Sequence, residues 1–123
     1  MKIRVYYEDT DAGGIVYHTN YIKYCERARS EVFFQRNRIP TEDMQSGFVV
    51  RNINADFLAT STLGDMLAVT TEILKTKNSS MVLCQEVWKE ELKVFSMEIT
   101  LVYISKGRPC RIPESFKEIF ATL

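Results

Sequence analysis

Two carboxylates and the only histidine of the chain lie together just before a segment with helical periodicity. Residues 8–21 read EDTDAGGIVYHTNY and contain Asp9, Asp11, two adjacent glycines and His18. The N-terminus of a helix carries unpaired N–H groups and a partial positive charge, and a carboxylate beside it can act as a base or a nucleophile. The same residues also suit an ordinary turn that leads into a helix. The pattern alone leaves both interpretations open.

A short strand and a long helix flank this segment. Apolar and polar side chains alternate over residues 2–7, which predicts a strand that ends at Tyr7. Apolar residues then recur at helical spacing, which predicts an amphipathic helix over about 20–36. Thr19 or Asn20 is expected to cap the start of this helix.

After a polar loop, the hydrophobic period falls to two residues, which is typical of strands. Four long strands are expected, with one apolar face each: Val49, Ile53, Ala55 and Phe57; Leu67, Val69, Thr71 and Ile73; Met81, Leu83, Gln85 and Val87; Phe95, Met97, Ile99, Leu101 and Tyr103. The short connections between them favour antiparallel pairing. Pro113 is expected to open a short C-terminal helix over 114–120.

The balance between helix and sheet points to self-association. One long helix can cover only one face of so large a sheet, so the other face needs solvent or another subunit. The last long strand carries apolar residues on both sides, with Val102 and Ile104 next to Tyr103. We therefore expect an α+β fold, a single domain over residues 1–123, and a homo-oligomer.

The composition excludes several classes of protein. Sixteen basic residues balance sixteen acidic ones among 123, so no basic surface indicates a nucleic-acid partner. The chain shows no signal peptide and no apolar run of roughly 18 residues, so we expect a cytoplasmic protein, with association to the inner face of the membrane left open. Three scattered cysteines fit neither a disulfide framework nor a zinc site. No metal or other cofactor is expected.

The motif Asp9-x-Asp11-x-x-Gly14-x-Val16-x-His18-x-x-Tyr21 resembles the signature of the 4-hydroxybenzoyl-CoA thioesterase family. The longer run YYEDTDAGGIVYHTNYIKYCERAR is most similar to the Tol-Pal-associated acyl-CoA thioesterases of the YbgC type. The resemblance implies the hotdog fold, in which a five-stranded antiparallel sheet wraps around one long helix. It also implies a dimer with two sites at the subunit interface, often paired again into a tetramer.

The same resemblance implies a role for each motif residue. Asp11 would be the catalytic carboxylate, and the backbone N–H of His18 would polarise the thioester carbonyl while its imidazole contacts the substrate. Lys75 and Lys77 would bind the phosphates of coenzyme A. Four further residues would contact the substrate: Tyr7, Gly14, Val16 and Tyr17.

The substrate implied is the thioester of acyl-CoA or of acyl carrier protein, which offer the same pantetheine arm. Hydrolysis to the free acid is the leading hypothesis, and Asp11 would either attack the carbonyl or direct water. The alternative is a protein that binds acyl thioesters without catalysis, or a scaffold for envelope or phospholipid-synthesis proteins. Asp9 is interpreted as a turn former, with a coupled pair of acids left open.

Overall fold

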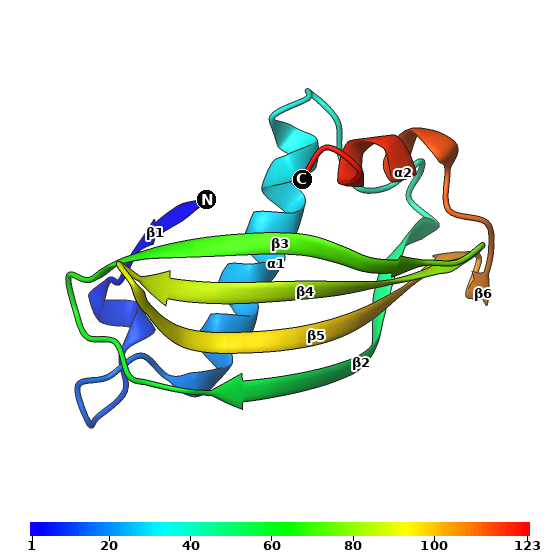
Figure 1. The fold of residues 1–123 in the computed structure, drawn as a ribbon. Helices are drawn as coiled ribbons and strands as arrows, with labels where there is room; N and C mark the ends of the chain where they lie inside the picture. The colour runs from blue at the N-terminus through cyan, green and yellow to red at the C-terminus, as the bar shows by residue number, and fades with distance from the viewer.

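The computed structural model describes all residues 1–123, which form one layer of antiparallel strands and two helices (Figure 1). In chain order the elements are β1 (Lys2–Arg4), a 3₁₀ turn (Tyr7–Asp9), α1 (His18–Phe34), β2 (Ser46–Phe57), β3 (Met66–Thr76), β4 (Ser80–Lys89), β5 (Leu92–Ser105), β6 (Arg108–Pro109) and α2 (Glu114–Phe120). None of the helices is both long enough and apolar enough to cross a membrane.

The strands form a single sheet in the order β1-β3-β4-β5-β2, with every neighbouring pair antiparallel. The two-residue β6 folds back on β5 and was not expected. Helix α1 crosses the concave face of the sheet, and α2 covers one end of it (Figure 1). A curved antiparallel sheet around one long helix is the hotdog fold, so the predicted fold class is confirmed.

The core lies between α1 and the concave face of the sheet. Tyr21, Tyr24, Cys25 and Ala28 repeat along one side of α1 and are buried, as the helical spacing predicted. They meet the inward faces of β3, β4 and β5, where Phe95 stacks on Tyr21 at 5.4 Å between ring centroids. Burial raises the pKa of the Cys25 thiol to about 12, so this cysteine is an inert small hydrophobe.

The start of α1 and the end of β1 differ from the sequence prediction. The helix begins at His18 instead of about residue 20, and Tyr17 is its cap residue, without a side-chain hydrogen bond. Asn20, one of the predicted caps, donates instead from its side chain to the carbonyl of Asp9 at 2.8 Å. Tyr7 lies in the 3₁₀ turn, because β1 pairs with β3 only as far as Arg4.

A bulge in β2 changes which residues of this strand face the core. Val50 pairs with Leu101, and Asn52 pairs with the adjacent residue Thr100. This leaves Arg51 as the extra residue. Because of this extra residue, Val50 and Ile53 share the inward face although they are three positions apart. The predicted grouping of Val49 with Ile53 is therefore wrong.

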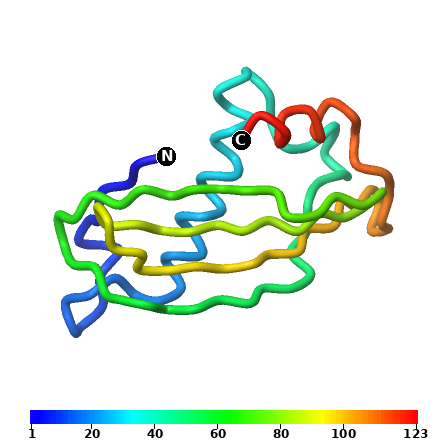
Figure 2. Tube along the Cα trace, in the orientation of Figure 1, coloured from blue at the N-terminus to red at the C-terminus, as the bar shows by residue number.

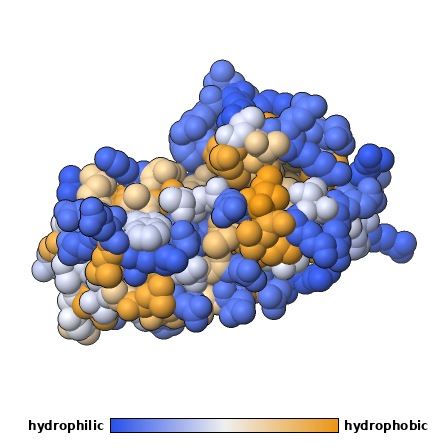
Figure 3. Space-filling model, in the orientation of Figure 1, coloured by the Kyte–Doolittle hydropathy of each residue, from blue (hydrophilic) through white to orange (hydrophobic).

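The outer face of the sheet carries hydrophobic residues among hydrophilic ones, as the space-filling view shows (Figure 3). The outward side chains include Val49, Val82 and Val102 toward one end and Glu72, Glu86 and Glu98 further along. Val49 is 41% exposed and Val102 is buried. The outer face is thus apolar at one end and acidic beyond it.

Candidate active site

The motif segment folds into a small hairpin that leads directly into α1. Thr10 pairs with Val16, and the backbone N–H of Asp11 donates to the carbonyl of Ile15 at 2.9 Å. The turn is completed at Gly14, whose φ of 82° lies in the left-handed region that favours glycine. A second bridge joins Ile15 to Thr62 in the connection between β2 and β3, so two distant segments lie side by side (Figure 2).

Asp9 holds this hairpin in place. It is 7% exposed, and its Oδ2 accepts a hydrogen bond from the backbone N–H of Tyr6 at 2.9 Å. Its carbonyl accepts from the backbone N–H of Tyr17 at 2.9 Å and from the Asn20 side chain. Burial, with the Asp9 carboxylate nearby, raises the pKa of the Tyr24 phenol. These contacts make Asp9 the turn former that the sequence indicated.

Asp11 is exposed and points its carboxylate into the hairpin turn. Its Oδ1 accepts a hydrogen bond from the backbone N–H of Gly13 at 2.8 Å. A Cβ on Gly13 would lie only 3.2 Å from this oxygen, so glycine leaves room for the carboxylate. One oxygen of Asp11 is therefore fixed by the turn, and no hydrogen bond within the chain uses the other.

The first turn of α1 offers free backbone donors. Tyr17 caps the helix without a side-chain hydrogen bond, and no acidic residue lies in the first turn. The backbone N–H groups of His18 and Thr19 make no hydrogen bond within the chain. Such a helix end is suited to hold an oxyanion, because unpaired N–H groups and the helix dipole act together.

Aromatic side chains surround this helix end. The imidazole of His18 lies 4.7 Å from the ring of Tyr17 and 5.8 Å, edge to face, from that of Phe57 at the end of β2. Tyr17 is 46% exposed and Tyr7 is 82% exposed, so both side chains are available to a ligand. The contact with Phe57 places the helix N-terminus beside the edge strand of the sheet.

Val16 and Ser61 are buried and hold the hairpin against the core. Val16 is 3% exposed and packs in the core, and its backbone N–H donates to the carbonyl of Ser61 at 2.8 Å. Ser61 is 1% exposed, and its Oγ accepts from the hydroxyl of Tyr21 at 3.1 Å. Ser61 could not be predicted from the sequence, because no local pattern marks a buried serine in a long connection. The substrate contact expected of Val16 remains a prediction.

Lys75 and Lys77 do not lie near Asp11 within one chain. The hairpin meets the beginning of β3 through Thr62, whereas both lysines lie at or beyond the other end of this strand. At about 3.3 Å per residue, the strand separates the two sites by roughly 30 Å. Only a second subunit could bring these lysines to the helix end.

The site is open in the single chain. None of the main cavities of the chain is lined by Asp11 or His18. Both residues are exposed, and His18 lies next to the end of β2, which is an edge strand of the sheet. A substrate cleft here therefore needs a second wall.

The model of the thioesterase superfamily matches residues 13–96, from the hairpin turn into β5. The chain belongs to the thioesterase superfamily. This match spans the second half of the hairpin, α1 and the long strands β2, β3 and β4. The superfamily assignment therefore rests on most of the chain.

Two relatives and one solved structure extend this assignment over nearly the whole chain. The thioesterase chain is 42% identical to "Acyl-CoA thioesterase YbgC" of Helicobacter pylori J99, with all of both chains covered. It is 37% identical to "Acyl-CoA thioester hydrolase YbgC" of Escherichia coli O6:H1, over 92% of this chain and 88% of the other. A thioesterase of Thermus thermophilus solved with coenzyme A and zinc is 27% identical, with a TM-score of 0.81 over 98% of this chain and 94% of the other.

Proposed function

We propose that the protein hydrolyses acyl-CoA thioesters to the free acid and coenzyme A. The proposal is carried by one observation, the exposed Asp11 carboxylate held in a fixed turn next to a helix end whose first N–H groups are unpaired. The names of the Helicobacter and Escherichia relatives support the same substrate class. A protein that only binds or scaffolds would have no chemical use for this arrangement.

In the proposed reaction, the thioester oxygen accepts hydrogen bonds from the N–H groups of His18 and Thr19. The Asp11 carboxylate removes a proton from water while the water oxygen bonds to the carbonyl carbon. The negative charge that develops on the carbonyl oxygen is stabilised by the helix end. When the carbon–sulfur bond breaks, the proton held by Asp11 passes to the departing sulfur. Direct attack of the carboxylate on the carbonyl carbon is the alternative first step.

A second copy of the chain would close the site. Strand β2 is the longer of the two edge strands of the sheet and leaves twelve residues with one unpaired edge. Apolar side chains along it are exposed, including Val50 at 50%, Ile53 at 36% and Phe57 at 49%. Long, apolar, unpaired edges are rare in monomers because they promote strand addition. We propose a dimer through β2, with a tetramer built from two such dimers, in the cytoplasm.

The test is the variant Asp11→Asn, assayed on acyl-CoA with a thiol-trapping reagent. The amide keeps the shape and the turn hydrogen bond but removes most of the basicity, so turnover should fall by about 10²-fold or more. Asp43→Asn is the matched control, because Asp43 accepts the same kind of bond from a backbone N–H two residues later, at 2.7 Å. Near-full turnover by folded Asp11→Asn would refute the catalytic role of this carboxylate.

A further inference from the structure

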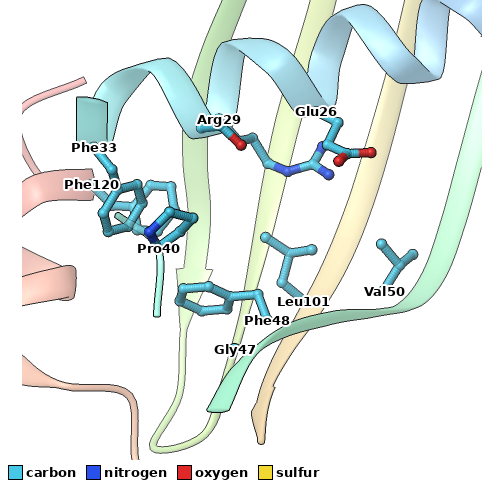
Figure 4. Close-up of a pocket in the computed structure, with 10 residues that line it drawn as sticks. Glu26, Arg29, Phe33, Pro40, Gly47, Phe48, Val50, Leu101 and Phe120 are labelled. Atoms are coloured by element: carbon cyan, nitrogen blue, oxygen red, sulfur yellow. The ribbon is translucent and has the colours of Figure 1, made fainter. Parts of the chain in front are cut away.

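A cavity of about 350 Å³ lies between the second half of α1 and the beginning of β2 (Figure 4). It is separate from the Asp11 hairpin, and nothing in the reaction proposed above uses it within one chain. Half of its ten lining residues are apolar side chains from both helices, β2 and β5: Phe33, Phe48, Val50, Leu101 and Phe120. Two charged residues of α1, Glu26 and Arg29, also line it.

The side chain of Arg29 is held in place from inside the core. Its Nη1 donates to Oε1 of Gln85 at 2.8 Å, and Gln85 has no exposed surface. The Gln85 amide nitrogen donates in turn to the carbonyl of Cys25 at 2.9 Å and to Oγ1 of Thr71 at 3.0 Å. In Figure 4, the guanidinium lies under α1, facing the side chains that rise from the sheet. A satisfied core amide therefore fixes the orientation of this arginine.

Most of the hydrogen-bonding capacity of Arg29 is unused. The guanidinium has five N–H donors, and the bond to Gln85 is the only one its side chain makes in the chain. None of the three ion pairs includes Arg29, although Glu26 lines the same cavity. Burial lowers the pKa of Arg29, and the nearby charge of Glu26 offsets this only in part because no ion pair forms between them, so burying the guanidinium remains costly. The spare donors thus face a cavity where a ligand oxygen could reach them.

The proposed dimer brings this cavity to the other subunit's helix end. One end of β2 borders the cavity through Phe48 and Val50, and the other end, Phe57, touches His18. If two copies pair antiparallel through β2, about a two-fold axis normal to the sheet, opposite ends of the strand lie next to each other. The cavity of one protomer then lies beside the partner's His18.

We propose that the cavity receives the acyl group of a thioester held at the partner's Asp11 and His18, and that Arg29 selects acyl groups carrying an oxygen acceptor. This inference rests on the proposed function. Hydroxy-, keto- and carboxy-acyl groups share the required chemistry, since each offers an oxygen to the guanidinium. The aromatic and aliphatic wall would enclose the carbon chain.

The first test compares matched thioesters: butyryl- with 3-hydroxybutyryl-CoA, and hexanoyl- with 6-hydroxyhexanoyl- and adipoyl-CoA. The parent should show at least about tenfold higher kcat/KM for an oxygen-bearing member, the scale of a hydrogen bond from a charged donor. Arg29→Met should reduce this ratio to near one. Because each ratio is taken within one variant, any loss of folded protein cancels. The hydroxylated and carboxylated members distinguish a neutral from an anionic acceptor.

Arg27→Met is the matched control, because Arg27 is an exposed arginine of α1 that does not line the cavity. It should keep the parent's ratio. Equal kcat/KM for plain and oxygen-bearing thioesters in the parent, or an unchanged ratio in Arg29→Met, would overturn the inference while leaving acyl-CoA hydrolysis intact. Absence of turnover with every thioester would instead refute the proposed function.

The second test asks whether cavity and carboxylate come from different subunits. Ser30 lines the cavity, so Ser30→Trp should fill it and impair turnover. Co-refolding Ser30→Trp chains with Asp11→Asn chains should restore about a quarter of the parent activity, since half the dimers are mixed and each has one intact site. No recovery would overturn the shared site. Arg29→Met, assayed on the preferred thioester, replaces Ser30→Trp if that chain does not fold.

Discussion

The two acids of the motif differ in their surroundings although they are two positions apart. Asp9 is buried and ties the 3₁₀ turn to the start of α1, whereas Asp11 is exposed and makes one hydrogen bond within its own turn. A buried carboxylate with satisfied acceptors stabilises a fold, and an exposed one with a free oxygen can meet a substrate. The separation of structural and chemical roles can be tested residue by residue.

For Asp9→Asn, we expect a loss of about 1–2 kcal/mol in the free energy of unfolding, because the Tyr6 N–H loses a charged acceptor inside the loop. Turnover should fall less than tenfold, well below the roughly 10²-fold loss expected for Asp11→Asn. Urea denaturation and steady-state kinetics on both variants check this. Equal losses of turnover would mean that the two acids work as a pair.

Local sequence patterns could identify the turn before α1 and the approximate start of this helix, because turn residues and helix entry depend on neighbours in the chain. They could not identify Ser61 or the exposure of Tyr7. Ser61 acts through a connection forty residues beyond Tyr21, and Tyr7 leaves β1 because that strand pairs for only three residues. Such features depend on contacts between distant segments, which a single sequence does not display.

At the scale of elements, α1 shows how tertiary contacts replace a local cap. Propensity favoured Thr19 or Asn20 as the cap, yet the helix starts at His18 because the Tyr17 N–H is held by the Asp9 carbonyl. The opposite end follows local rules more closely. Asn37 has a φ of 55° and donates its N–H to the carbonyl of Phe34 at 3.0 Å, a common way to end a helix.

The conformation of Asn37 yields a stability prediction. Asn37→Ala should lower the free energy of unfolding by about 1–2 kcal/mol, because alanine lacks the tolerance of asparagine for the left-handed region. Asn37→Gly should change it by less than about 0.5 kcal/mol, since easier backbone geometry offsets a more flexible unfolded chain. Urea denaturation of the three proteins measures this. Identical losses for Ala and Gly would show that the Asn side chain matters more than its backbone angle.

At the scale of the whole molecule, the open edge of β2 should control assembly. We expect the protein to sediment as a dimer or tetramer of the 14.3 kDa chain at micromolar concentration. Ile53→Lys should produce folded monomers with much lower turnover, because it places a charge on the partly exposed inward face of the edge strand, beside the β2 of the other copy. Leu92→Lys, at a 54% exposed position on β5 away from that edge, should leave assembly unchanged. A stable monomer of the parent protein would contradict the dimer.

The distance between the lysines and the Asp11 hairpin gives a second prediction at this scale. If Lys75 and Lys77 bind the phosphates of coenzyme A across the dimer, replacing both with alanine should raise KM several-fold and leave kcat nearly unchanged. The effect should weaken at high salt, since exposed charges are screened. The pair Lys2→Ala/Lys23→Ala, also exposed, serves as the control. An unchanged KM would move the phosphate site, with Arg108 and Arg111 as the next candidates.

The bulge at Arg51 makes β2 unequally sensitive to the loss of single residues. Deleting Arg51 would leave Val50 opposite Leu101 and Ile53 on the same inward face, because the extra residue is the one removed. Deleting Asn54 would shift everything on one side of it by one position and turn that half of the strand inside out. Loss of Arg51 therefore preserves the pairing register of β2 and the face on which each side chain lies. Loss of another residue within the strand would move core side chains to the surface and surface side chains to the core.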